Sequence, residues 1–303
     1  MTVLILCIVT AVFFPGLIVR VKSLLSGRKG PGILQPWKNI RVLLRKGSVI
    51  STTTSFIFSI SPVVYFCTVV CAILLLPFPG RPTLFSFEAD FVFFAYLLAF
   101  GKFLFILNAL DTGSSFEGMG ANREALYSML AEPAFFILFG TLALLTGNTS
   151  FEGIFSHLQA GGASTTVIMI IAVYLLVQIA MIENSRMPVD DPKTHLELTM
   201  IHEVMILDHS GFNLALVQAG TILKFNLYGS LIANCIIPHG LGFAWQIVFF
   251  FGIQAGFAIS IGILESFRAR KKLARNPQFI VTLSSIALIA FVLALLVTFK
   301  LIP

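Results

Sequence analysis

The chain has 303 residues, of which 57% are hydrophobic and 11% are charged, and its mean hydropathy is +0.94. This composition excludes a soluble globular domain and is typical of a protein that crosses a lipid bilayer several times. We interpret the net charge of +6 as a signal of how the chain is oriented in the membrane, with anionic lipid as a partner. Nothing in the sequence predicts binding to nucleic acid.

Long apolar runs predict an all-α polytopic membrane protein that forms a single membrane domain over residues 1–303. A membrane-spanning helix needs about 20 apolar residues, and the runs are continuously apolar rather than alternating, which excludes a β-barrel. Eight spans are predicted, at residues 2–20, 54–77, 90–110, 127–146, 164–183, 212–237, 241–264 and 279–302.

Basic residues are concentrated in the loops at one end of the predicted spans. The first, third, fifth and seventh loops together hold 16 of the 20 lysines and arginines. Because basic loops are retained on the cytoplasmic side, we expect these loops to face the cytoplasm and both termini to lie outside the cell inner (cytoplasmic) membrane.

The first loop, residues 21–53, begins with the turn-rich "SGRKGPGILQPW" and continues as "KNIRVLLRKG". In the second part, Ile40, Leu43 and Leu44 alternate with basic residues at helical spacing. This pattern predicts an amphipathic helix at the membrane surface. A plain basic loop that only sets topology is the alternative.

The third loop contains "DTGSSFEGMGANREALYSMLAEP", which we interpret as loose and glycine-rich up to a helix that begins near Asn122, a good N-cap. Glu132 follows inside the fourth span. Lys102 and Lys224 lie near the middle of the third and sixth spans. Ionisable groups at such depth need a partner or water, so we expect both lysines to face a protein interior, with Glu132 pairing with one of them. A purely structural ion pair between two helices is the alternative.

The fifth loop, "IENSRMPVDDPKTHLELTMIHEVMILDHSG", is the most polar stretch. Thr194 to Asp208 is predicted to form a short helix, on which His195, His202 and His209 recur every seven residues. That spacing places them about 10 Å apart, too far to share one metal ion. Neighbouring carboxylates and imidazoles can instead hold and pass protons, although a solvated polar loop remains the alternative.

The same loop resembles a known signature. "ENSRMPVDDP" followed by "HLELTMIHEVMILDHSG" is similar to the E-x-x-R-x-P-F-D motif and glutamate-rich helix of the NADH dehydrogenase subunit 1 family, and "GRKGPGILQP" looks like a shortened form of its first-loop segment. Within this family, the sequence is more similar to the hydrogenase branch, which comprises membrane anchor subunits of formate hydrogenlyases and other energy-converting nickel-iron hydrogenases. Val189 replaces the usual Phe, and Lys193 and His195 stand where quinone-reducing relatives tend to have carboxylates.

The resemblance implies that this chain is a non-catalytic anchor and coupling subunit of an oxidoreductase complex. It implies no catalytic residue and no bound cofactor or metal here, with the nickel-iron centre and iron-sulfur clusters in partner subunits. Expected partners are the hydrogenase large and small subunits, iron-sulfur subunits and antiporter-like membrane subunits, in a hetero-oligomer. The residues and the resemblance together predict a proton path and coupling set of Lys102, Glu132, Glu183, Asp190, Glu197, His202, Glu203, Asp208 and Lys224. The set predicted to dock the hydrophilic module is Arg28, Gly30, Pro31, Gln35, Pro36, Arg186 and Pro188.

Two other functions are consistent with the sequence. A quinone-site subunit of a respiratory NADH dehydrogenase would need a chamber between the first helix, the surface helix and the fifth loop. A stand-alone ion transporter would use Lys102, Glu132 and Lys224 as its ion site, but such transporters commonly contain inverted repeats, and no internal repeat is visible.

Overall fold

The computed structural model describes residues 2–81, 83–158, 162–190, 200–268 and 273–299, and over these residues the chain is helical apart from loops and one isolated bridge between Phe78 and Arg81. In chain order the helices are α1 (Thr2–Leu25), α2 (Gln35–Leu43), α3 (Phe56–Leu74), α4 (Asp90–Asp111), α5 (Ser115–Thr146), α6 (Phe151–Leu158), α7 (Ala163–Glu183), α8 (His202–Met205), α9 (Gly211–Ile236), α10 (Phe243–Phe267), a 3-10 turn (Leu273–Arg275) and α11 (Asn276–Thr298).

The all-α membrane fold is confirmed, whereas the number of spans is confirmed only in part. Among the described residues, α1, α3, α4, α5, α7, α10 and α11 are long and apolar enough to cross a bilayer. The predicted sixth span corresponds to α9, which is long enough but is not among these seven. Its sequence is diluted by Lys224 and by three asparagines, so its apolar character is weaker.

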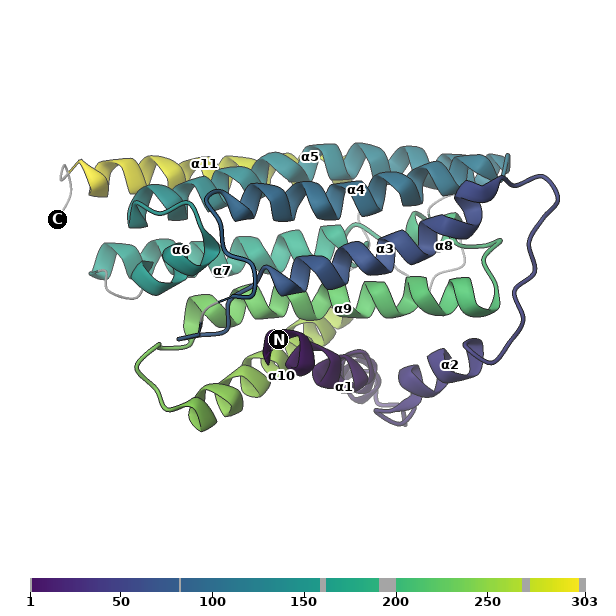
Figure 1. Ribbon diagram of the computed structural model, residues 1–303, viewed down its shortest axis with the longest axis horizontal. Helices are drawn as coiled ribbons and strands as arrows, with labels where there is room; N and C mark the ends of the chain where they lie inside the picture. Colours follow the sequence, from purple (N-terminus) through teal and green to yellow (C-terminus); the bar gives the residue numbers. More distant parts are fainter. Residues whose placement is uncertain (1, 82, 159–161, 191–199, 269–272, 300–303) are drawn as a thin grey trace.

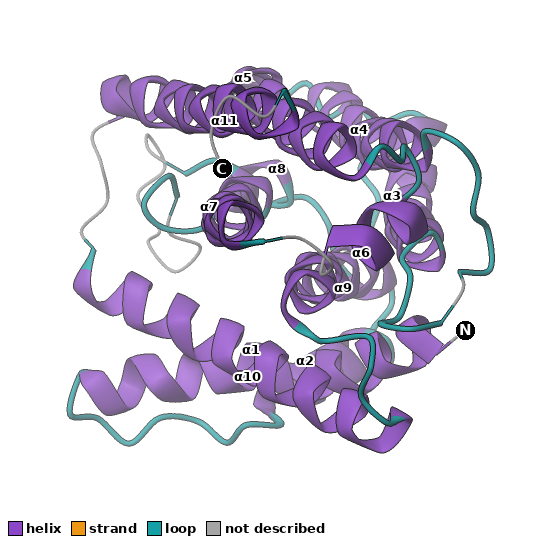
Figure 2. Ribbon diagram, turned by 90° about the vertical axis from the view of Figure 1, so that its left-hand side faces the viewer, coloured by secondary structure: helices purple, strands orange, loops and turns teal. Residues whose placement is uncertain are grey.

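Helix α9 lies at the centre of the bundle and contacts α3, α1, α10 and α7 (Figures 1 and 2). Most of its residues are buried, including Lys224, Asn226 and Asn234. A helix that is enclosed by protein does not need an apolar surface toward lipid. This position explains how α9 carries polar side chains that an outer helix of the bundle could not.

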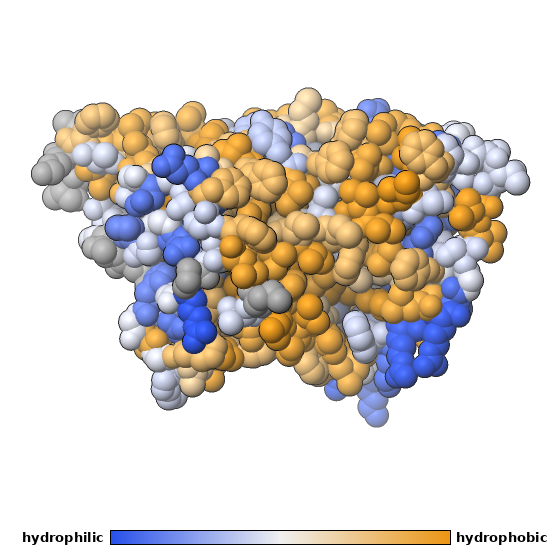
Figure 3. Space-filling model, in the orientation of Figure 1, coloured by the Kyte–Doolittle hydropathy of each residue, from blue (hydrophilic) through white to orange (hydrophobic). Residues whose placement is uncertain are grey.

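One face of the molecule is divided by polarity. In Figure 3 apolar side chains cover the middle of the visible face, and polar ones gather toward its two ends, one of them over α2. Exposed apolar residues of the long helices include Phe93, Phe103, Ile170 and Val248. An apolar band between polar ends is the pattern of a protein whose solvent is a bilayer.

The predicted surface helix of the first loop is observed as α2. It begins at Gln35, with Pro36 in its first turn, and buries Ile40 while most of its other side chains are exposed. The preceding segment lies on α1 at Gly16, where a Cβ atom would come 1.7 Å from the carbonyl oxygen of Ile33. Gly16 therefore permits the close approach that places α2 beside the bundle.

Two predicted helix boundaries are wrong. The helix that contains Glu132 begins at Ser115 rather than near Asn122, since Gly120 packs closely on Ile201 and Met205 and thereby fixes the first turns of α5 against α8. The predicted helix from Thr194 to Asp208 is also not observed over its described part, where only His202–Met205 is helical. Tertiary packing decides both segments against the local pattern. Residues 191–199, with His195 and Glu197, lie outside the described residues.

Candidate ion chain and junction cavity

Four charged side chains from four helices form a continuous buried array, here called the ion chain: Glu124 of α5, Lys102 of α4, Glu183 of α7 and Lys224 of α9. Lys102 Nζ lies 3.1 Å from Glu124 Oε1 and 2.9 Å from Glu183 Oε2, and the same Glu183 oxygen lies 2.8 Å from Lys224 Nζ. The four side chains are between 2% and 14% exposed. The prediction that both lysines face carboxylates in a protein interior is confirmed.

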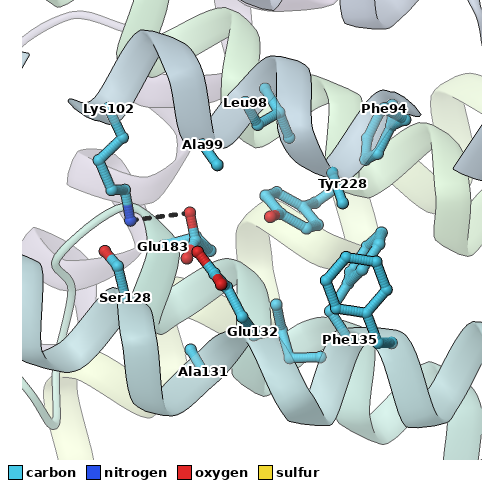
Figure 4. Close-up of a pocket in the computed structure, with 13 residues that line it drawn as sticks. Phe94, Leu98, Ala99, Lys102, Ser128, Ala131, Glu132, Phe135, Glu183 and Tyr228 are labelled. Atoms are coloured by element: carbon cyan, nitrogen blue, oxygen red, sulfur yellow. Dashed lines mark ion pairs between the residues drawn. The ribbon is translucent and has the colours of Figure 1, made fainter. Parts of the chain in front are cut away.

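The predicted pairing of Glu132 with a lysine is wrong, because the ion pairs of Lys102 and Lys224 go to Glu124 and Glu183. Glu132 lies on the exposed surface of α5 and lines a cavity of about 40 Å³ together with Lys102, Glu183 and Tyr228 (Figure 4). The cavity is large enough to hold water, and water in it would link Glu132 to the ion chain.

Glu183 ends α7 in a Schellman motif, a helix ending in which two backbone N–H groups fold back onto the last turn. The N–H of Arg186 donates to the carbonyl of Met181 at 2.8 Å, and that of Ser185 to Ile182 at 3.0 Å. Ser185 is left-handed, with a φ of 48°. Its hydroxyl donates to Glu124 Oε2 at 3.0 Å. The loop after α7 is therefore attached to the ion chain at two places, through Glu183 and through Glu124.

A second cavity, of about 390 Å³, lies where α1, α2, α8, α9 and the loop after α7 meet, and we call it the junction cavity. Its polar lining includes Gln35, Asn39, Ser185, Arg186, His202, Glu203, Gln218 and Thr221. Ser185 thus belongs to both sites, because it lines this cavity and also contacts Glu124. The cavity wall and the ion chain are physically continuous.

Arg186, on the wall of the junction cavity, is held by a buried carboxylate. Its Nη1 atom lies 3.2 Å from Glu265 Oε1, and the other oxygen of Glu265 lies 2.8 Å from Lys22 Nζ. The Glu265 side chain is fully buried, whereas the two cations are about one-fifth exposed. The Arg186 guanidinium also lies 5.1 Å from the centre of the Phe225 ring. Glu265 therefore joins α1, α10 and the loop after α7.

Asp190 and Asp208 are placed by backbone contacts. Buried Asp190 accepts hydrogen bonds from the backbone N–H groups of Ile201, at 3.1 Å, and His202, at 3.3 Å. These bonds attach the loop after α7 to the start of α8. Asp208 is exposed, and its backbone N–H donates to Glu117 at 3.2 Å. Both aspartates belong to the framework around α8.

Two of the predicted histidines are held neutral at the cytoplasmic end predicted from the sequence. Burial lowers the pKa of His202 to about 4, against an opposing effect of nearby Glu124. Burial also lowers the pKa of His209 to about 4. The His209 ring stacks on Phe58 at 4.3 Å between centroids, and its Nε2 hydrogen-bonds to Asn108. Both imidazoles are therefore unprotonated at neutral pH and become protonated only at acidic pH.

A family model for NADH dehydrogenase matches residues 1–299 of this chain. The chain belongs to the NADH dehydrogenase family. Two curated relatives from Escherichia coli (strain K12) are similar to it: hydrogenase-4 component C, 32% identical over 75% of this chain and 71% of that protein, and formate hydrogenlyase subunit 4, 26% identical over 72% of this chain and 70% of that protein.

Among solved structures, a chain of the membrane-bound sulfane sulfur reductase, an archaeal respiratory membrane complex, has a TM-score of 0.81 with 17% identity, covering 97% of each chain. At that identity the likeness shows the fold alone. The recognition of an NADH dehydrogenase family member with hydrogenase-type relatives, made from the first- and fifth-loop motifs, is confirmed. The chain is a membrane subunit of the kind found in such multisubunit complexes.

The residues predicted to dock a hydrophilic module in this NADH dehydrogenase family member lie at one end of the bundle, in different surroundings. Pro31, Gln35, Pro36 and Arg186 line the junction cavity, Arg28 is exposed, Gly30 lies against Ser23, and Pro188 is buried. Their role in docking stays a prediction.

Sequence reasoning missed two carboxylates of the site, Glu124 and Glu265. Glu124 stands in the third turn of α5, before the predicted fourth span, and Glu265 in the last turn of α10, where charged residues ordinarily face water. Each is more than nine-tenths buried and pairs with lysine or arginine. The available signal was charge compensation, because two lysines in mid-span require more than one buried carboxylate.

Proposed function

We propose that this chain is the membrane anchor and coupling subunit of a multisubunit membrane-bound nickel-iron hydrogenase, of the formate hydrogenlyase or energy-converting type. It docks the hydrophilic electron-transfer module and connects redox chemistry there to translocation of protons or sodium ions. The observation that carries the proposal is the continuity between the loop after α7, which lines the junction cavity, and the ion chain inside the membrane. The names of the two curated relatives support the hydrogenase branch.

The coupling follows from the electrostatics of charges buried in a medium of low dielectric constant. A redox step in the docked module changes charge or loop geometry at residues 183–190. Because Glu183 Oε2 holds both Lys102 and Lys224, displacing it leaves a buried cation uncompensated, which costs several kcal/mol unless a proton or another charge moves. Because the charges of the ion chain alternate in sign, a change in the pairing of one member changes the pairing of its neighbours, from α5 to α9.

Glu132 offers an exit from the ion chain toward a neighbouring membrane subunit. It lies 14 residues before Thr146, the last residue of α5, which corresponds to roughly 21 Å along the helix axis and so to the hydrocarbon region. An exposed carboxylate at that depth is costly against lipid. We infer that an antiporter-like subunit covers this surface of α5 in the complex and receives the ion there.

The test uses the intact complex in sealed vesicles, with ion uptake measured per electron transferred by the hydrogenase. Lys224→Met and Glu132→Gln are expected to lower uptake while dye-linked hydrogen oxidation by the module continues. Arg81→Met is the matched control, because it removes one positive charge at an exposed position outside the ion chain. Full uptake in both variants, with normal assembly, would contradict the proposal.

A quinone-site subunit is a second candidate, favoured by the junction cavity. That hypothesis requires a chamber between the first helix, the surface helix and the fifth loop, and the junction cavity is bounded by α1, α2 and the loop after α7. Photoreactive quinone analogues distinguish the two functions. Labelling near Gln35 and Arg186, together with activity that depends on added quinone, would favour the quinone site, and the coupling subunit predicts neither.

The stand-alone transporter is distinguished by purification. The coupling subunit is expected to copurify with iron and nickel carried by its partners, measurable by elemental analysis. A transporter would be isolated alone and would transport ions in vesicles without any redox partner.

A further inference from the structure

Ser185 occupies a position where the backbone favours glycine. It is the left-handed residue of the Schellman motif that ends α7, with a φ of 48°, and among the described residues Ala89 is the other non-glycine in this region. Such positions usually carry glycine, because a Cβ atom is strained there. Non-glycine residues held in this strained region cluster at functional sites, so the contacts of the Ser185 side chain point to its role.

The contact made by that side chain lies at the head of the ion chain. The Ser185 hydroxyl donates to Glu124 Oε2 at 3.0 Å, while the other oxygen of this carboxylate, Oε1, pairs with Lys102 at 3.1 Å. Ser185 is 3% exposed and Glu124 5%, so water competes little for this hydrogen bond. The two oxygens of one carboxylate are thereby divided between the loop and the membrane interior.

The loop side of this contact is also the wall of the junction cavity, since Asn184, Ser185 and Arg186 all line it. Any event that shifts these three residues, whether a cavity occupant or the docked module, changes the distance from the Ser185 hydroxyl to Glu124. The carboxylate then rotates or loses a donor, and its pairing with Lys102 changes with it.

We propose that Ser185 is a positioning residue, whose hydroxyl fixes the Glu124 carboxylate and connects movement of the cavity wall to the ion chain. The inference rests on the proposed coupling function and deepens it, because it names the contact through which the loop acts on the buried charges.

Ser185→Gly is the decisive variant, because glycine relaxes the left-handed backbone while removing the hydroxyl. The thermal unfolding midpoint of the purified complex is expected to stay close to that of the unmodified complex, because relief of the left-handed backbone offsets loss of the hydrogen bond. Ion uptake per electron in sealed vesicles is expected to fall about tenfold to a hundredfold, in line with loss of a hydrogen bond to a charged group. Ala89→Gly is the matched control, since it gives the same backbone relief at the start of α4, and its uptake is expected to equal that of the unmodified complex.

A double-mutant cycle tests whether Ser185 acts through Glu124. Glu124→Gln is expected to lower uptake, and Ser185→Gly is expected to add nothing in that background. Ser185→Asn, which tolerates the left-handed backbone and keeps a donor, is expected to recover part of the uptake.

The possible failures are distinguishable. Normal uptake by Ser185→Gly alongside a defective Glu124→Gln would overturn the role of Ser185 and leave the coupling function standing. A fully additive double variant, or a lower unfolding midpoint that accompanies the loss of uptake, would assign Ser185 a merely structural role and overturn the inference. Normal uptake by Glu124→Gln and Lys224→Met, or no uptake by the unmodified complex, would remove the coupling function and the inference together.

Discussion

Glu183 is the residue on which the buried charges depend most. One of its oxygens holds both Lys102 and Lys224, and its backbone carbonyl accepts a further hydrogen bond from Lys224 at 2.9 Å. Glu183→Gln would leave Lys224 as a buried cation without an ion pair, a change that typically costs about 3–5 kcal/mol. We expect a lower thermal unfolding midpoint for the purified complex.

A second substitution separates lost pairing from lost packing. Adding Lys224→Met to Glu183→Gln removes the uncompensated cation, so the double variant is expected to be more stable than Glu183→Gln alone. If the decrease in unfolding midpoint of the double variant equals the sum of the decreases in Glu183→Gln and Lys224→Met, the two residues do not form an energetically coupled pair.

His209 predicts a pH dependence of stability with a definite sign. Its folded pKa is about 4, against an ordinary value of 6.5, so between these values the unfolded chain binds a proton that the folded chain does not. Stability is therefore full above pH 6.5 and falls as the pH decreases toward 4, by at most about 1.4 kcal/mol per pH unit. His209→Phe keeps a ring against Phe58 and is expected to show a smaller loss between pH 7.5 and pH 5.

Unfolding midpoints at the two pH values check this expectation. Since His202 has a lowered pKa as well, the variant should retain part of the pH dependence. The comparison is between slopes, because His209→Phe also removes the contact with Asn108 and lowers stability at both pH values. Equal slopes in the variant and the unmodified chain would show that His209 is not buried as described.

At the scale of elements, Glu265 joins the end of α10 to α1 and to the loop after α7. Glu265→Gln leaves Lys22 and Arg186 without their carboxylate. Because both cations are partly exposed, we expect a moderate loss of about 1–3 kcal/mol. Lys22→Met should cost less, since Glu265 keeps Arg186. Thermal unfolding of the two variants gives the order, and an equal cost would mean that the contact with Arg186 contributes nothing.

Exchanging the charges of Lys22 and Glu265 sharpens this test. In an isolated pair, Lys22→Glu combined with Glu265→Lys would restore stability. Here the new lysine would face Arg186, so the exchanged variant is expected to remain less stable than Lys22→Met alone. Full recovery would show that the pair is independent of the loop.

The elements also show which parts of the fold follow from sequence. Runs of about 20 apolar residues predict the seven apolar helices, because lipid leaves the backbone no alternative to helix. The first turns of α5 and the segment around α8 did not follow, because Gly120 of the one packs on Ile201 of the other. Such packing between distant segments overrides local pattern.

For the site, mid-span position identified Lys102 and Lys224, because a charge at that depth is costly without a partner. The partners themselves were not predictable, since Glu124 and Glu265 lie just outside the predicted spans 127–146 and 241–264, where a charged residue ordinarily meets water. The sequence predicts for Glu132 the pairing that Glu124 makes, and the two residues are eight positions apart on one helix. Which of several carboxylates points inward is decided by how α5 is rotated against α4, and the sequence of α5 alone does not contain that information.

For the whole molecule, the basic loops and the position of α9 predict how the chain crosses the membrane. We expect both termini outside and the loops after α7 and α10 inside. Reporter fusions after Asp208 and after Gly240 test whether α9 crosses, because the two reporters should lie on opposite sides. Fusions after Gly113 and Gly147 are the control pair on either side of α5. Both reporters flanking α9 on one side would reduce the number of spans to seven.

The central, polar α9 has a consequence for how the protein is made. A nascent segment that carries Lys224 and three asparagines partitions poorly from the translocon into lipid. Its membrane insertion therefore depends on the earlier helices that enclose it and on α10, which follows after a short turn. Lys102, Glu124 and Glu183 leave the ribosome before Lys224 does. The charge that completes the ion chain is thus the last of the four to enter the bilayer.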